Sequence, residues 1–109
     1  MQAGKDICVS VLMLTYNQEE YVDSAIESVV AQRTDFNVEL VIGDDCSTDS
    51  TVARCRRWVE RFPEKIRLLE SERNGGLLAN FARTLAECHG RYIAICEGDD
   101  YWTDNSKLQ

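Results

Sequence analysis

The sequence predicts an α/β fold of the Rossmann-like, three-layer α/β/α kind, with a mainly parallel four-stranded sheet. Three observations lead to this prediction. Four short apolar runs alternate along the 109 residues with three amphipathic helical patterns, which is the β-α-β-α-β-α-β order typical of parallel sheets. Right-handed crossovers place helices on both faces of such a sheet. The length suits one domain, residues 1–109, with a single core.

The first half of the chain contains two predicted strands, each followed by a helix. Residues 7–15 are almost entirely apolar without clean alternation, which is typical of a central strand buried on both faces. We expect Asn17 to cap the first helix, with Glu20 completing a capping box. Residues 38–42 form the second strand, and Asp49 or a neighbouring hydroxyl caps the second helix.

The second half contains two more strands around a third helix. Pro63 ends the second helix, and the shorter, more charged segment 66–69 is typical of an edge strand. Residues 73–76 form a tight turn, and residues 92–96 return as the fourth strand. The third helix is expected to turn its apolar residues toward the sheet, namely Leu77, Leu78, Phe81, Leu85 and Ala86.

Composition narrows the class of protein. Hydrophobic residues make up 44% and charged residues 28% of the chain, which excludes disordered and collagen-like classes. The longest apolar stretch, residues 7–14, falls short of the roughly 20 residues that a membrane span needs, and the first residues show no signal-peptide pattern. The formal net charge of −7 comes without a basic stripe, which argues against nucleic acid as a partner. We expect a soluble, cytoplasmic protein.

The cysteines predict a reducing environment. Five are present without a Cys-x-x-Cys pair, at positions 8, 46, 55, 88 and 96. The only histidine is His89, near the end of the third helical pattern, where a surface position or a contact with the helix dipole is expected. Because zinc sites need clustered Cys and His, zinc is not predicted.

An acidic cluster, Glu97-Gly98-Asp99-Asp100, directly follows the fourth apolar run. Adjacent carboxylates repel one another, and a hard divalent cation with oxygen ligands relieves that repulsion. We expect Asp99 and Asp100 to hold Mg²⁺ or Mn²⁺, which would bridge the phosphates of a diphosphate. Glu97 points to the same side as Asp99 on an extended chain and could bind a ribose hydroxyl or a metal-bound water. A solvated turn explains the cluster about as well when it is taken alone.

Polar residues follow the first, second and fourth predicted strands. The carboxyl ends of parallel strands meet at one edge of a sheet, where ligands bind. The candidate substrate-binding residues are Thr15, Tyr16, Asn17, Asp44, Asp45, Glu97 and Asp99. Asp45 can accept a hydrogen bond from the ring imide of uracil or thymine, and Tyr16 can stack on a base or simply pack at the rim. Asn74 and Asn80 could add hydrogen bonds across the cleft.

These motifs, in this order, resemble the amino-terminal half of family 2 glycosyltransferases of the type A fold. The resemblance rests on residues 9–17, 41–49 and 90–102, and three spaced motifs are far more specific than one Asp-x-Asp. It implies transfer of a sugar, with inversion at the anomeric carbon, from a uridine- or thymidine-linked nucleoside diphosphate donor. The implied acceptor is a carbohydrate or a lipid-linked molecule, as in polysaccharide biosynthesis. The implied cofactor is Mn²⁺ or Mg²⁺. It also implies that Asp45 binds the base, and that Asp99 and Asp100 bind ribose and metal. Glu97 departs from the commoner aspartate at its position.

The resemblance further implies a truncated type A fold, because nothing here matches the family's acidic general base. We therefore expect a domain that binds the donor but transfers poorly by itself, whose complete form can work at the cytoplasmic face of a membrane. An exposed sheet edge could promote formation of a homo-oligomer. The main alternative is a receiver-type phospho-acceptor domain that binds Mg²⁺, although such domains carry acidic residues after the first strand, where this chain has Thr15, Tyr16 and Asn17.

Overall fold

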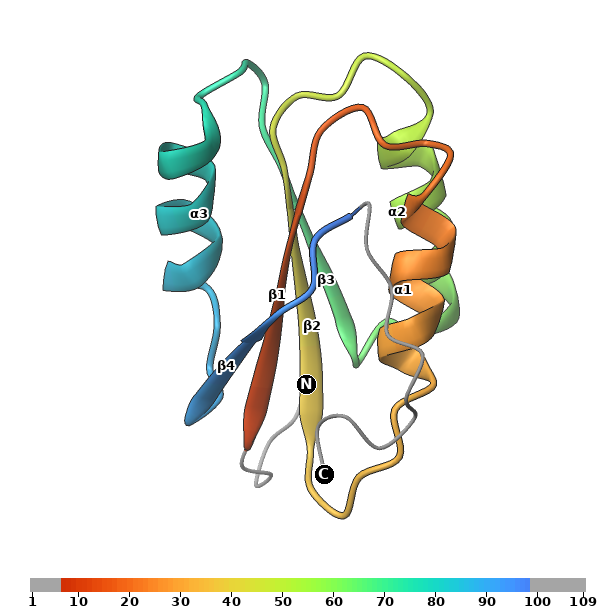
Figure 1. The fold of residues 1–109 in the computed structure, drawn as a ribbon, viewed down its shortest axis with the longest axis vertical. Coiled ribbons are helices and arrows are strands. Elements are labelled where there is room, and N and C mark those ends of the chain that lie inside the picture. Colours follow the sequence, from red (N-terminus) through yellow and green to blue (C-terminus); the bar gives the residue numbers. More distant parts are fainter. Residues whose placement is uncertain (1–6, 99–109) are drawn as a thin grey trace.

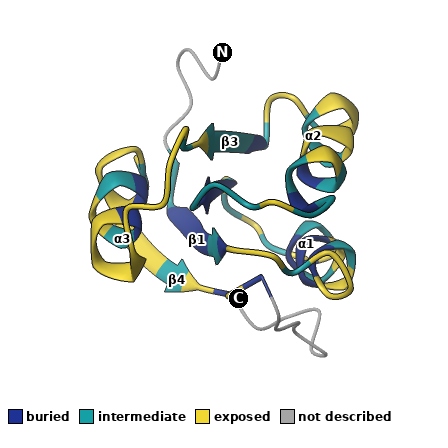
Figure 2. Ribbon diagram, turned by 90° about the horizontal axis from the view of Figure 1, so that it is seen from above, coloured by how far each residue is buried: buried dark blue, intermediate teal, exposed yellow. Residues whose placement is uncertain are grey.

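The seven predicted elements follow one another in the expected order in the computed structural model, which describes residues 7–98 (Figure 1). They are β1 (Val9–Thr15), α1 (Val22–Val30), β2 (Val38–Asp44), α2 (Thr51–Arg61), β3 (Ile66–Glu70), α3 (Leu77–Ala86) and β4 (Tyr92–Ile95). The sheet has the strand order β3-β2-β1-β4, and every pairing is parallel. Helices α1 and α2 cover one face and α3 covers the other (Figure 2). The predicted three-layer α/β fold is confirmed.

The main hydrophobic core lies between the sheet and the α1/α2 layer. Val11 and Met13 of β1 point into it, and Ile26 and Val29 of α1 close it from the other side; all four are fully buried. Their spacing follows the two-residue period of a strand and the helical period of an amphipathic helix. β1 is a central strand and β3 an edge strand, as predicted.

Helix α3 faces the sheet with polar side chains, so the prediction of an apolar inner face is wrong. Leu77 and Leu78 are 71% and 81% exposed, whereas Asn80 and Thr84 are buried. The physical reason lies in β2, where Gly43 has no side chain and lets the helix approach closely. Asn80 Nδ2 donates to the Gly43 carbonyl oxygen at 2.9 Å, so short polar groups fit where large apolar ones would not.

The Gly43→Ala variant is expected to lower the free energy of unfolding by about 1–3 kcal/mol, the usual cost of overpacking. A Cβ at this position would lie 1.8 Å from Thr84 Oγ1 and 3.0 Å from Thr84 Cβ. Urea denaturation measures the loss, and Gly75→Ala is the matched control because a Cβ there meets ordinary van der Waals distances. Adding Thr84→Ala should recover part of the loss; equal stability of Gly43→Ala and wild type would contradict the close approach.

The loop before α1 does not form the predicted capping box. α1 begins at Val22 without a side-chain cap, and Asn17 instead lies in a left-handed conformation, with φ of 50°. Its Oδ1 accepts the backbone N–H of Thr48 at 2.8 Å, so the amide joins two loops. The start of α2 is closer to the prediction that Asp49 or a neighbouring hydroxyl caps this helix. Asp49 Oδ1 accepts the backbone N–H of Thr51, the first residue of α2, at 2.9 Å.

None of the five cysteines forms a disulfide. The pKa of the Cys55 thiol is raised to about 12, mainly because the residue is buried. Cys55 therefore stays a neutral thiol and packs as a small hydrophobic residue. No helix in the range 7–98 is long and apolar enough to cross a membrane.

A polar cluster lies at the amino-terminal ends of the strands, opposite the predicted site. Glu39 is 5% exposed and accepts hydrogen bonds from Ser10 Oγ and from the His89 backbone N–H, both at 2.6 Å. The His89 ring lies 3.4 Å from Glu39 and 3.1 Å from Arg67. His89 is therefore a surface residue that helps to satisfy a buried carboxylate.

Candidate functional site

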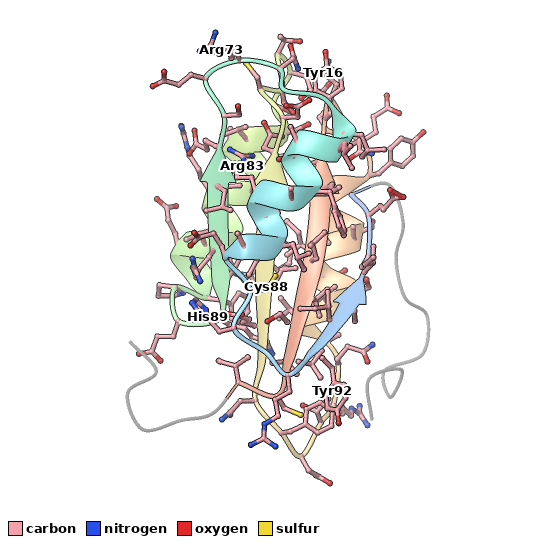
Figure 3. The ribbon with its side chains drawn as sticks, turned by 90° about the vertical axis from the view of Figure 1, so that its left-hand side faces the viewer. Tyr16, Arg73, Arg83, Cys88, His89 and Tyr92 are labelled. Carbon is pink, nitrogen blue, oxygen red and sulfur yellow. The ribbon has the colours of Figure 1, made fainter. Side chains whose placement is uncertain are left out.

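A cleft of about 260 Å³ opens at the carboxyl-terminal edge of the sheet, beside the start of α3. Figure 3 shows Tyr16 and Arg73 at this end of the molecule. The cleft is lined by Leu14, Thr15, Tyr16, Gln18, Asp45, Leu77, Asn80 and Glu97. Residues at or just after the ends of β1, β2 and β4 therefore meet the start of α3 at one edge. Four of the predicted site residues, Thr15, Tyr16, Asp45 and Glu97, line one cleft.

Strand geometry separates the two neighbouring aspartates. Successive side chains of a strand point to opposite faces, so Asp44 and Asp45 point apart at the end of β2. Asp45 points to the α3 side and lines the cleft. Asp44 is paired in register with Thr15 and is fully buried. Only one of the two carboxylates can therefore reach a ligand in this cleft.

Asp44 joins the ends of β1 and β2. One carboxylate oxygen, Oδ1, accepts the Thr15 and Ser47 hydroxyls, both at 2.6 Å, and Oδ2 accepts the Ser47 backbone N–H at 2.8 Å. Ser47 Oγ also accepts the backbone N–H of Asn17 at 2.9 Å. Asp44 and Asn17, both predicted to bind substrate, thus hold the rim loops together and lie outside the cleft lining.

Further hydrogen bonds link the loop before α1 to the loop before α2. Gln18 N–H donates to Thr51 Oγ1 at 2.8 Å, and Glu19 N–H donates to Asp49 Oδ2 at 3.3 Å. Partial burial opposes the ionisation of Asp49, but the hydrogen bonds from Thr51 and Glu19 outweigh it and lower the pKa of its carboxyl. The rim is therefore preorganised by bonds to ionised and hydroxyl oxygens.

Asp45 ties the end of β2 to the loop before α3. Its Oδ1 accepts the Gly75 N–H at 2.7 Å and its Oδ2 accepts the Gly76 N–H at 3.1 Å, while Asn74 Nδ2 donates to the Asp45 carbonyl oxygen at 2.5 Å. Gly76, with φ of 90°, adopts a conformation that favours glycine. Each carboxylate oxygen keeps acceptor capacity for a ligand, and its orientation is set by the loop.

The sequence reasoning missed three cleft residues, Leu14, Gln18 and Leu77. Gln18 continues the two-residue spacing of Leu14 and Tyr16 beyond the end of β1, and that spacing was a usable signal. Leu77 was assigned to a buried helix face and instead lines the cleft. Asn80 reaches the cleft as expected, but its amide already binds the Gly43 carbonyl and the Arg83 guanidinium.

The predicted metal ligands, Asp99 and Asp100, lie outside the described residues, as does the ribose contact of Asp99. Glu97 is exposed and reaches the cleft. Within residues 7–98 no group of three His, Cys, Asp or Glu side chains is arranged to hold a metal ion. Carboxylate oxygens are nevertheless the ligand type that Mg²⁺ and Mn²⁺ prefer, and Glu97 brings one to the edge where the acidic cluster begins.

Comparison with known proteins adds a family match. The sequence pattern of the family described as glycosyl transferase family 2 matches residues 10–109. An uncharacterised protein of Mycobacterium tuberculosis is 45% identical over 100 residues, which cover 92% of this chain and 29% of that protein. A Bacillus subtilis protein named for teichuronic acid biosynthesis, TuaG, is 34% identical, over 86% of this chain and 36% of its own length.

Two solved structures share the fold closely. The Staphylococcus aureus protein TarS in complex with UDP superposes with a TM-score of 0.81 and 28% identity, over 94% of this chain and 30% of TarS 1–349. The mannosyltransferase PcManGT of Pyrobaculum calidifontis, in complex with GDP-mannose and Mn²⁺, gives a TM-score of 0.83 and 26% identity, over 96% of this chain and 31% of its own. The chain thus spans about a third of the length of these proteins.

Proposed function

The chain belongs to glycosyltransferase family 2, and on this basis we propose that it binds the donor of an inverting glycosyl transfer, a uridine- or thymidine-linked nucleoside diphosphate sugar. The proposal depends most on one observation: Asp45 presents an oriented carboxylate inside a cleft at the carboxyl ends of parallel strands. TarS binds UDP and PcManGT binds GDP-mannose with Mn²⁺, so related folds bind this class of ligand.

The cleft suits the nucleoside part of such a donor. Its volume, about 260 Å³, is below the range of about 300–1,000 Å³ typical of sites that enclose a whole ligand. The uracil N3–H would donate to Asp45, the ring would lie between Tyr16 and Leu77, and the ribose would extend toward Glu97. The diphosphate would then leave the cleft on the side where the acidic cluster begins.

We further propose that Asp99 and Asp100 hold Mn²⁺ or Mg²⁺ against that diphosphate. A bound divalent cation neutralises phosphate charge and stabilises the departing nucleoside diphosphate. Thr15, Asp44 and Asn17 act as positioning residues in this proposal, because their side chains connect the rim loops. The family match to glycosyltransferases leaves the receiver-type alternative without support.

Calorimetric titration of the 109-residue chain with UDP tests the proposal. We expect binding in the presence of MnCl₂ and clearly weaker binding when the metal is chelated, because phosphate and carboxylates repel one another without the cation. CDP serves as the control nucleotide, since cytosine presents an acceptor where uracil presents a donor. Absence of UDP binding with and without Mn²⁺, in a chain shown to be folded, would refute the proposed function.

The Asp99→Asn variant is expected to weaken Mn²⁺-dependent binding of UDP at least roughly tenfold, or about 1.4 kcal/mol, because one charged oxygen ligand is lost. Thermal stability should stay unchanged or rise slightly, since repulsion within the acidic cluster falls. Glu60→Gln, at an exposed position on α2, is the matched neutralisation control. Retention of full Mn²⁺-dependent affinity in Asp99→Asn would contradict the metal role.

The acceptor and the catalytic base belong to the proposal for a longer protein. In that proposal the acceptor is a carbohydrate or a lipid-linked carbohydrate. An acidic residue outside this chain deprotonates the acceptor hydroxyl. The reaction takes place in the cytoplasm or at the cytoplasmic face of a membrane. The 109 residues alone are then expected to bind the donor and to transfer sugar poorly. Self-association through an exposed sheet edge is also part of the proposal.

A further inference from the structure

Arg83 links α3 to the carboxyl-terminal ends of two strands through a single nitrogen. Its Nη2 donates to Asn80 Oδ1 at 2.6 Å, to the Asp44 carbonyl oxygen at 3.0 Å and, more weakly, to the Leu69 carbonyl oxygen at 3.4 Å. Figure 3 shows Arg83 beside α3, toward β3. The ion pairs among residues 7–98 do not include Arg83. Its charge therefore strengthens bonds to neutral oxygens of the α3 and strand ends.

The bond to the Asp44 carbonyl acts on the peptide group that leads into Asp45. A peptide group is planar, so the Asp44 carbonyl and the Asp45 N–H belong to one rigid unit. The Asp45 N–H donates to the Thr15 carbonyl oxygen at 3.0 Å, and Arg83 binds the opposite side of the same unit. The plane is thus held by β1 and by α3, and its orientation sets the direction in which the Asp45 side chain leaves the backbone.

Asn80 makes a second connection, one residue earlier in β2. Only the oxygen of a side-chain amide accepts hydrogen bonds and only the nitrogen donates. Because Arg83 donates to Asn80 Oδ1, the amide nitrogen faces the Gly43 carbonyl oxygen, to which it donates at 2.9 Å. Asn80 is 5% exposed and lines the cleft. Arg83 therefore also determines which way a polar group in the cleft wall faces.

The loop before α3 holds Asp45 from the other side. The Gly75 and Gly76 N–H groups bind the Asp45 carboxylate, but they belong to an exposed loop. Arg83 instead ties the backbone of the same residue to a helix and to two strands. Hydrogen bonds weaken steeply as their angle departs from linear, so a small rotation of this backbone would misalign the carboxylate with a bound base.

We propose that Arg83 is a positioning residue that sets the selectivity of the cleft for uridine over cytidine nucleotides. It lies outside the cleft lining and acts by fixing the Asp44–Asp45 peptide group and the Asn80 amide, which together aim the Asp45 carboxylate at the base. This inference rests on the proposed function, in which Asp45 accepts the uracil N3–H.

Calorimetric titration of the Arg83→Met variant with UDP and with CDP, both with MnCl₂, tests this role. Methionine keeps an apolar stem but no donor. The affinity for UDP should fall roughly fivefold, or about 1 kcal/mol, while the affinity for CDP changes by less than about twofold. A variant that is partly unfolded would bind both nucleotides more weakly by the same factor. The ratio of the two affinities therefore reports positioning and not stability.

A double variant tests whether Arg83 acts through Asp45. In the Asp45→Asn background, Arg83→Met should change the ratio by less than about twofold, because the carboxylate that it aims is already gone. Arg67→Met is the matched control. Arg67 also connects β3 with the end of α3, where its guanidinium binds Glu87, but it lies at the amino-terminal part of β3. Its loss should leave the ratio at the wild-type value.

Hydrogen exchange of the nucleotide-free chain gives a readout that is independent of donor binding. The Asp45 amide should exchange roughly fivefold faster in Arg83→Met than in wild type, because one side of its peptide group is released. If Arg83→Met does not fold by circular dichroism, Arg83→Gln replaces it with the same expectations. Glutamine keeps one amide nitrogen as a donor on a shorter side chain, which stays near Asn80 but falls short of the Asp44 carbonyl.

The outcomes separate this inference from the proposed function. An unchanged ratio of UDP to CDP affinity in a folded variant would overturn the role of Arg83 and leave the proposed function standing. The same holds for a full effect of Arg83→Met in the Asp45→Asn background, or for unchanged exchange at the Asp45 amide. Failure of the wild-type chain to bind UDP would instead refute the proposed function, and this inference with it.

Discussion

Replacing Asp44 with alanine is expected to lower the free energy of unfolding by about 3 kcal/mol. The carboxylate is fully buried and accepts three hydrogen bonds, from the Thr15 hydroxyl and from the hydroxyl and backbone N–H of Ser47. Its removal leaves the buried Thr15 hydroxyl unsatisfied, at about 1–3 kcal/mol before relaxation and water entry, and also deprives the two partly buried Ser47 donors of their acceptor. Urea denaturation monitored by circular dichroism measures the loss, with the slope of the transition checked for two-state behaviour.

Two further variants assign the effect to the hydrogen bonds. Asp44→Asn keeps the size and one acceptor oxygen, so its loss should be smaller than that of Asp44→Ala. Glu60→Ala, on an exposed helix position, should change stability by no more than about 0.5 kcal/mol. A loss of less than about 1 kcal/mol in Asp44→Ala would mean that water replaces the carboxylate at little cost, and the structural role assigned to Asp44 would be wrong.

The Asp45→Asn variant is expected to lose most of its preference for uridine over cytidine nucleotides, with the ratio of affinities falling at least roughly tenfold. The carboxylate can only accept hydrogen bonds, so it favours the uracil N3–H and repels the cytosine N3 lone pair. An amide offers one donor and one acceptor, so it suits either base. Competition binding with UDP and CDP in the presence of Mn²⁺ measures the ratio.

The same substitution should loosen the loop before α3. One of the two bonds from Gly75 N–H and Gly76 N–H would face an amide donor, and amide hydrogen exchange of both glycines should quicken. Asp49→Asn is the matched control, because it removes the same charge from the same rim at a residue outside the cleft lining. If Asp45→Asn discriminates between the two bases as wild type does, the base-binding role of Asp45 fails.

The arrangement of the elements was predictable because it depends on repeating patterns. β1 and β3 took the central and edge positions that their composition indicated, since burial on both faces requires a continuous apolar run. The convergence of Tyr16, Asp45 and Glu97 on one cleft followed from the parallel order of the strands. Neither inference required knowledge of a particular side-chain contact.

The predictions that failed all concern which partner a short polar side chain selects. Asn17 was expected to cap α1 and instead binds the Thr48 N–H of the neighbouring loop. In α3, Asn80 and Thr84 turn toward the sheet in place of the leucines, because a glycine 37 residues from Asn80 leaves room for them. Residues so far apart in the chain leave no local signal of their contact.

Residue order alone thus establishes the α/β class, the family resemblance and the edge of the sheet where polar loops meet, because strand and helix periods and strand-end positions are local properties. Only the folded chain separates Asp44, a buried joint between two strands, from Asp45, an accessible acceptor. It also decides that the apolar surface of α3 and β4 stays uncovered within residues 7–98. Those outcomes depend on close packing between distant segments, where a missing Cβ or a one-residue alternation changes which side chain is buried.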